Sequence, residues 1–188
     1  MIPRLFFVMM TLVTISALSA ETTDFASRLE KLNAEIKEKP DEPMLLYCKA
    51  QCLMSLGKYD DGYECAKQAM ALFIKKNDKL SWMLLESIEL ETVRIDVHFN
   101  MGPKERTPPD IGIVRPLSFR VWSKDKEKKL LETYDFEIGY VNGKPSTAAI
   151  GQLQGEVHVN FGTMEPDVKY SEIRKKAETL IKERLKKQ

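Results

Sequence analysis

The chain contains two histidines, and they occur in two similar short stretches. His98 lies in "DVHFN" and His158 in "EVHVN", each two positions after an acidic residue, Asp96 or Glu156. Imidazole nitrogens and carboxylates are ligands for zinc and similar metal ions, and side chains two apart in a strand share one face. The four residues could form a metal site only if the two strands were neighbours in register. Strand alternation alone gives the same pattern, so we expect two half-exposed strands whose imidazoles point away from the core.

The other reactive residue types show no catalytic arrangement. The sequence has no Gly-rich phosphate loop, no Gly-x-Ser-x-Gly segment and no Cys-x-x-Cys pair. Arg120 and Trp122 alternate onto one face of a predicted strand, where they could stack on a sugar or a peptide, although burial of the tryptophan under a helix is the more usual arrangement. We therefore expect a protein that is not an enzyme and needs no cofactor.

Three cysteines, Cys48, Cys52 and Cys65, lie close together in the sequence. An odd number leaves at least one thiol without a partner in the same chain. Cys48 and Cys52 stand four residues apart on a predicted helix, where their side chains are parallel and do not face each other. The disulfide that we expect, if one forms, joins Cys52 and Cys65.

The N-terminal segment predicts export. Arg4 precedes an apolar stretch of about 16 residues, which is shorter than the roughly 20 that a membrane-spanning helix needs. The stretch ends in the small residues "ALSA" at positions 17–20. We interpret residues 1–20 as a secretory signal, with an uncleaved anchor as the alternative, and expect a periplasmic or secreted protein without an integral membrane segment after cleavage.

The charge balance argues against a nucleic-acid partner. The chain has 29 basic and 28 acidic residues, so loss of the segment that contains Arg4 leaves equal numbers of each sign. A protein that binds DNA or RNA needs an excess of lysine and arginine along one face. The composition leaves the oligomeric state open.

Residues 21–89 have the apolar spacing of helices. The pattern predicts helices over about residues 24–39, 43–56 and 60–74, with Asp60 as the N-cap of the third. Pro40 and Gly57 separate them.

The stretch "PDEPMLLYCKAQCLMSLGKYDDGYECAKQAMALF" resembles a tetratricopeptide repeat, a helix pair with a 34-residue period. The small residues at Ala50, Gly62 and Ala69 match positions where the two helices of that family approach closely. The resemblance covers roughly residues 24–85, as one full repeat with a half-repeat on either side. It implies a concave groove for a protein or peptide partner, lined by Met44, Tyr47, Gln51, Met54 and Ser55. The alternative for this stripe is burial against the rest of the same chain.

From Leu90 the apolar period becomes that of strands, and residues 90–163 predict an antiparallel, sandwich-like β domain. We expect strands over about 93–100, 116–123, 134–140 and 153–161, with 147–150 as a short fifth, and a turn at Asn142-Gly143. The histidine strands would be the first and last of this sheet. Residues 164–188 predict a C-terminal helix that packs on the sheet through an apolar stripe, formed by Tyr170, Ile173, Ala177, Leu180 and Ile181.

These features predict an α+β fold and an exported, non-enzymatic protein-binding or scaffold protein that uses the tetratricopeptide-like groove. One alternative is a metal-binding protein or metal-dependent enzyme built on Asp96, His98, Glu156 and His158. A second is a glycan-binding module of the cell envelope.

Cleavage of the signal gives a first prediction. The protein purified from its own host should begin at or next to Glu21, because the small residues before it suit signal peptidase. Intact-mass measurement checks this, and a chain that still begins at Met1 would support the anchor instead.

Overall fold

A computed structural model of the chain describes residues 24–76, 82–100, 110–125, 127–154 and 157–187. The predicted signal segment and Glu156 lie outside the described residues. Within them, no helix is long and apolar enough to cross a membrane.

The N-terminal part is helical, as predicted. A first helix covers residues 24–38, and it is followed by α2 (Pro43–Ser55) and α3 (Tyr59–Lys75). Pro43 lies in the first turn of α2, where its missing N–H has no intrahelical partner, and Gly57 ends the segment with a φ of +73°. The N-cap assigned to Asp60 is wrong, because α3 begins one residue earlier and Asp60 bonds to another helix.

Six strands follow, and they form one antiparallel sheet in chain order, β1-β2-β3-β4-β5-β6. Their bounds are β1 (Trp82–Glu89), β2 (Val93–Asn100), β3 (Ile111–Ser123), β4 (Leu130–Val141), β5 (Lys144–Gln154) and β6 (Val157–Met164). A final helix, α4 (Tyr170–Leu185), closes the chain. The α+β class is therefore confirmed, although the strands make a single sheet and not two packed sheets. The Asn142-Gly143 turn is also confirmed, with φ values of +52° and +70° that suit a tight hairpin.

β1 lies in a segment that the sequence analysis assigned to the helical region, so the predicted boundary at residue 89 is wrong. The reason is a register shift between Leu84 and Glu86, where β1 pairs with β2. The buried residues of β1 are Met83, Leu85 and Ile88, whose uneven spacing hides the period of two. From Trp82 onward, the predicted second half-repeat is a strand.

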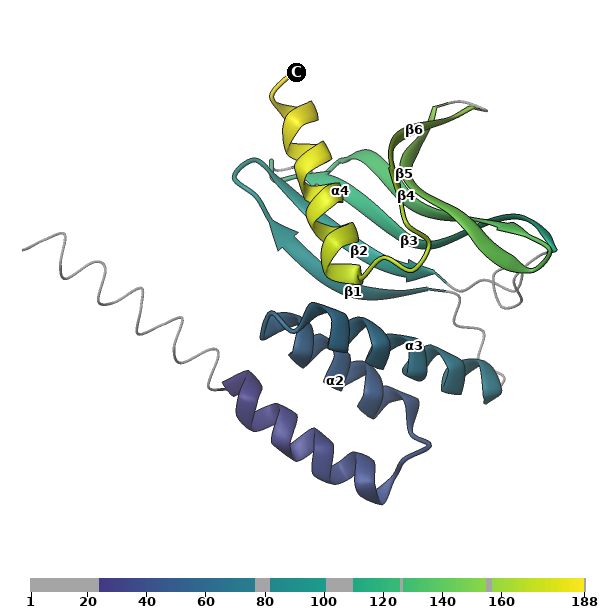
Figure 1. The fold of residues 1–188 in the computed structure, drawn as a ribbon. Coiled ribbons are helices and arrows are strands. Elements are labelled where there is room, and N and C mark those ends of the chain that lie inside the picture. The colour runs from purple at the N-terminus through teal and green to yellow at the C-terminus, as the bar shows by residue number, and fades with distance from the viewer. Residues whose placement is uncertain (1–23, 77–81, 101–109, 126, 155–156, 188) are drawn as a thin grey trace, which may run out of the picture.

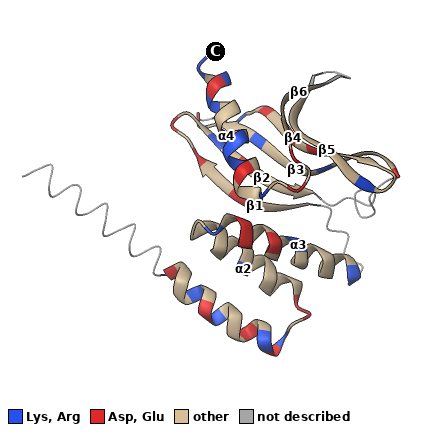
Figure 2. Ribbon diagram, viewed as in Figure 1, with Lys and Arg blue, Asp and Glu red and all other residues tan. Residues whose placement is uncertain are grey.

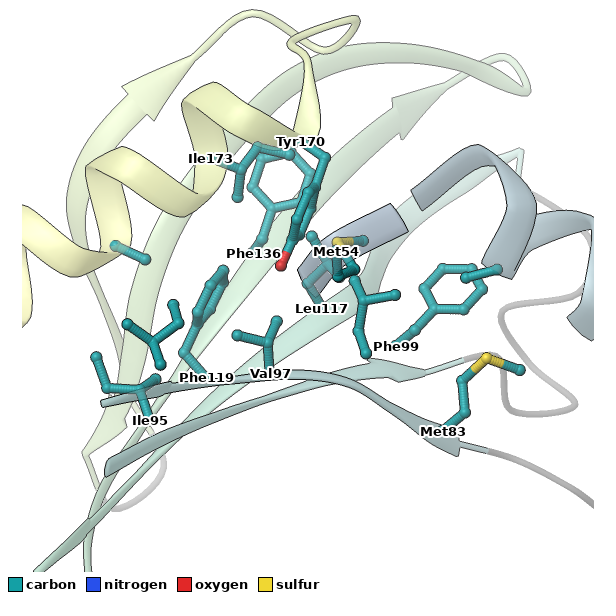
Figure 3. Close-up of a cluster of buried hydrophobic side chains, with 14 of the residues drawn as sticks. Met54, Met83, Ile95, Val97, Phe99, Leu117, Phe119, Phe136, Tyr170 and Ile173 are labelled. Atoms are coloured by element: carbon teal, nitrogen blue, oxygen red, sulfur yellow. The ribbon is translucent and has the colours of Figure 1, made fainter. Parts of the chain in front are cut away.

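The helices cover one face of the curved sheet (Figure 1), with α4 across its concave side, α2 and α3 beside it, and the first helix outermost. We call the covered face the inner face and the opposite one the outer face. Val97 of β2 and Phe119 of β3 point from the inner face toward α4 (Figure 3), where Ile173 faces the sheet. Each of these three residues is at most 2% exposed. This packing confirms the predicted role of the α4 stripe. Acidic and basic residues alternate along the first helix and α4, whereas α2 carries one charged residue, Lys49 (Figure 2).

Polar contacts fasten α4 to the other elements. Glu86 of β1 accepts hydrogen bonds from the Tyr170 hydroxyl and from Arg174 Nε, the latter at 2.9 Å. The Arg174 guanidinium lies 4.3 Å from the centre of the Tyr59 ring of α3. Asp60 accepts hydrogen bonds from the backbone N–H and the hydroxyl of Ser171, at 2.8 and 2.9 Å. Asp60 thus satisfies one of the free N–H groups at the start of α4.

The close approach predicted between α2 and α3 gives a second testable prediction. A Cβ atom at Gly62 would lie 3.1 Å from the backbone oxygen of Ala50 and 3.0 Å from Met54 Cε. Gly62→Leu should lower the free energy of unfolding by about 1–3 kcal/mol, because overpacking outweighs a gain in helix propensity of about 1 kcal/mol. Urea denaturation measures the change, with Ala71→Leu at an exposed position of the same helix as the control. Equal stability of Gly62→Leu and wild type would contradict the close contact.

Candidate functional site

The predicted groove residues have different surroundings in the structure: Tyr47 is covered by β1, whereas Gln51 and Ser55 line an open cleft. The Tyr47 hydroxyl donates a hydrogen bond to the backbone oxygen of Leu84 at 2.7 Å and accepts one from Gln51 Nε2 at 3.0 Å. Met54 is buried against Gly62, whereas Met44 is 50% exposed. At Tyr47, therefore, β1 of the same chain covers the stripe, as the alternative interpretation proposed.

The other end of the stripe lines an open cleft. This β1-edge cleft has a volume of about 330 Å³ and lies between the first helix, α2 and β1. Its lining residues are Phe25, Arg28, Gln51, Cys52, Met54, Ser55 and 84–87. Gln51, Met54 and Ser55 belong to the predicted groove. The β1 residues were missed because their segment was assigned to the helical region. Phe25 begins the apolar spacing of the first helix, and no sequence signal singled out Arg28.

Main-chain groups and one cation give the β1-edge cleft its chemistry. β1 is the first strand in the sheet order, so one of its edges has no strand partner. In an edge strand, alternate residues direct N–H and C=O groups away from the sheet. Arg28 is exposed and forms no ion pair with another described residue. The cleft therefore offers a hydrogen-bonding edge, the half-buried apolar side chain of Phe25, and a guanidinium.

The histidine strands are not neighbours. β2 carries His98 and β6 carries His158, and β3, β4 and β5 lie between them. Asp96 accepts hydrogen bonds from Ser87 at 2.7 Å and from Arg94 at 2.9 Å. Among the described residues, no group of three metal-ligating side chains comes together. The pairing that a shared metal site requires is therefore absent from the sheet.

His98 lies on the outer face, as predicted, but the expectation of an exposed imidazole is wrong. His98 is only 6% exposed, because the Trp82 indole stacks on its imidazole with ring centres 4.9 Å apart and an interplanar angle of 10°. Burial lowers the pKa of His98 below its usual value; Arg120 adds to the shift and Asp96 opposes it. The His98 Nδ1 atom is buried and makes no hydrogen bond to another residue that the structure describes. The stack was not expected, because no strand was predicted at Trp82.

Polar side chains next to His98 bond to one another. Asn100 Nδ2 donates to Ser118 Oγ at 2.7 Å, and Ser118 Oγ donates to Asp135 Oδ1. The Ser118 hydroxyl thus donates its hydrogen bond to the Asp135 carboxylate and not to the His98 imidazole. These residues therefore lack the Ser-His contact of nucleophilic catalysis. Trp122 also lies half-buried on the outer face and not under the C-terminal helix, and its indole N–H is buried without a partner.

The predicted disulfide is not formed, since all three cysteines are free thiols. Cys52 lines the β1-edge cleft, whereas Cys65 faces a separate hollow and bonds to the backbone oxygen of Leu46 at 3.5 Å. Burial raises the pKa of both thiols, which disfavours the nucleophilic thiolate.

The stacked imidazole gives a third prediction. With His158→Gln as background, the remaining imidazole signal in proton NMR should titrate below about 6.5, because burial disfavours the charged form of His98. As the pH falls below about 6.5, the unfolded chain takes up a proton that the folded chain does not, so the folded state loses stability. Trp82→Ala should move the titration toward the unperturbed value. A wild-type imidazole that titrates at or above 6.5 would contradict the buried stack.

No protein-family model, no curated protein and no solved structure matches the chain.

Proposed function

We propose that the protein is a non-enzymatic binding protein that holds an extended peptide segment of a partner protein in the β1-edge cleft. The observation that carries the proposal is the position of the free β1 edge, which borders the open end of the groove formed by Gln51, Met54 and Ser55. The resemblance to tetratricopeptide repeats supports a peptide partner, and the predicted signal segment supports export.

We propose an extended peptide because the cleft exposes the edge of a strand, β1. An extended segment can add to a free edge as a further strand, in which main-chain hydrogen bonds supply affinity and alternate side chains supply selectivity. The Tyr47–Leu84 hydrogen bond occupies one carbonyl of β1 and limits the bound segment at that end.

The cleft also selects the type of peptide. The half-buried Phe25 suits an apolar side chain, and Arg28 suits an acidic side chain or a C-terminal carboxylate. Exposed ion pairs contribute only about 0.2–1 kcal/mol, so Arg28 affects selectivity more than affinity. The preferred ligand is therefore an extended peptide with one apolar and one acidic group.

The fourth prediction tests this proposal with seven-residue peptides, which are selected from a random display library for binding to the chain without the predicted signal segment. Ser55→Trp should fill the cleft and weaken the selected peptides at least about tenfold, equivalent to about 1.4 kcal/mol, as measured by fluorescence anisotropy. Arg28→Glu should weaken acidic peptides, whereas Lys37→Glu on the same helix should not.

Peptides with backbone N-methyl groups separate strand addition from side-chain binding. Methylation of alternate residues that face β1 should abolish binding, and methylation of the intervening residues should leave it intact. Selected peptides that bind Ser55→Trp as tightly as wild type would defeat the proposal, as would equal tolerance of both methylation patterns.

A further inference from the structure

A second, larger cleft lies on the helix side of the sheet and shares no residue with the β1-edge cleft. It has a volume of about 480 Å³ and opens between α3, the inner face of β2, β3 and β4, and the segment that leads into α4. We call it the aromatic cleft. Its main apolar lining residues are Tyr63, Phe99, Val114, Phe136, Ile138 and Tyr170.

Aromatic rings from three elements form one wall of this cleft. The Tyr63 ring of α3 stacks on Tyr170 at the start of α4, with centres 5.1 Å apart and an interplanar angle of 22°. The same ring meets Phe99 of β2 edge-on, at 5.4 Å and 83°. Such contacts hold each ring in a defined orientation. The wall is therefore formed before any ligand binds.

The charged residues around the cleft largely neutralise one another. Glu64 and Lys67 form an ion pair at 2.5 Å, and the Lys67 ammonium also lies 5.2 Å from the centre of the Tyr63 ring. Asp60 is occupied by its two hydrogen bonds to Ser171. The remaining charges, Asp167 and Lys169, are exposed and opposite in sign. A charged ligand would lose hydration here without gaining a dedicated partner, so the cleft favours a neutral one.

The hydroxyl of Tyr63 is a hydrogen-bonding group at the aromatic wall of the cleft. The Tyr63 hydroxyl makes no hydrogen bond to another described residue. Burial raises the pKa of Tyr63, so the phenol keeps its proton and can donate a hydrogen bond to a ligand. A hydrogen-bond acceptor on the ligand would complete this group.

The volume sets the size of the occupant. Ligand pockets for small molecules span roughly 300–1,000 Å³, and the aromatic cleft falls in that range. A single turn of a partner helix, with side chains, already fills about 400 Å³, so the cleft cannot accommodate the several turns of a helical partner.

We propose that the aromatic cleft is a binding site for a neutral, mainly apolar small molecule whose hydrogen-bond acceptor accepts a hydrogen bond from the Tyr63 hydroxyl. This site is independent of the peptide proposed for the β1-edge cleft.

The fifth prediction uses prodan, a neutral fluorescent naphthalene ketone whose carbonyl is an acceptor. The mature protein should bind one prodan saturably with a blue-shifted emission, and it should bind the anionic probe 8-anilino-1-naphthalenesulfonate less tightly. Tyr63→Phe should weaken prodan about tenfold, the effect of losing about one hydrogen bond in a buried site. The same variant should bind 2-dimethylaminonaphthalene, which lacks the carbonyl, as well as wild type does.

Two further variants locate the probe. Val114→Phe should fill the cleft and weaken both neutral probes, whereas Ser55→Trp in the β1-edge cleft should change neither. If Val114→Phe does not fold, as judged by circular dichroism, Tyr63→Phe decides the outcome. The proposal is overturned if wild type shows no saturable prodan binding, if Tyr63→Phe does not distinguish the two neutral probes, or if the anionic probe binds as tightly as prodan.

Discussion

The contact between Glu86 and Arg174 is the interaction on which the arrangement of helices and sheet depends. The two side chains are only 9% and 18% exposed, and each makes a further contact, Glu86 with Tyr170 and Arg174 with the Tyr59 ring. One ion pair thus joins β1, α3 and α4. Removing one partner of a buried pair leaves an uncompensated charge and typically costs about 3–5 kcal/mol. Both clefts depend on this contact, because Glu86 lines the β1-edge cleft and its side chain fixes Tyr170 in the wall of the aromatic cleft.

The irregularity in β1 explains how Glu86 reaches the helices. Regular alternation from the buried Met83 and Leu85 would turn Glu86 toward the outer face. The register shift instead places Glu86 opposite Val97, whose side chain lies in the core. A β-bulge redirects a side chain in this way at the cost of local pairing. The same irregularity therefore produces the ion pair and shapes the strand edge beside α2.

The same irregularity marks the limit of what the sequence can predict. Helical spacing, Gly57 and the Asn142-Gly143 turn are local signals, and the α2–α3 pair, the β4–β5 hairpin and the α4 stripe follow from them. The bulge hid β1, and with it the stack of Trp82 on His98 and the Tyr47–Leu84 bond that closes one end of the groove. These contacts join segments far apart in the chain. No local pattern specifies which residues such segments bring together.

The two clefts differ in what builds them, and this difference determines how each tolerates substitution. Side chains from three elements form the aromatic cleft, so single replacements at Tyr63 or Val114 change its shape or its hydrogen bonding directly. In the proposed function, the β1-edge cleft binds through backbone N–H and C=O groups, and proline is the one residue type that lacks the N–H. Met54, which lines this cleft, is also part of the α2–α3 contact at Gly62. Substitutions in the helix pair therefore alter the β1-edge cleft through packing, whereas the aromatic cleft changes mainly with substitutions of the residues that line it.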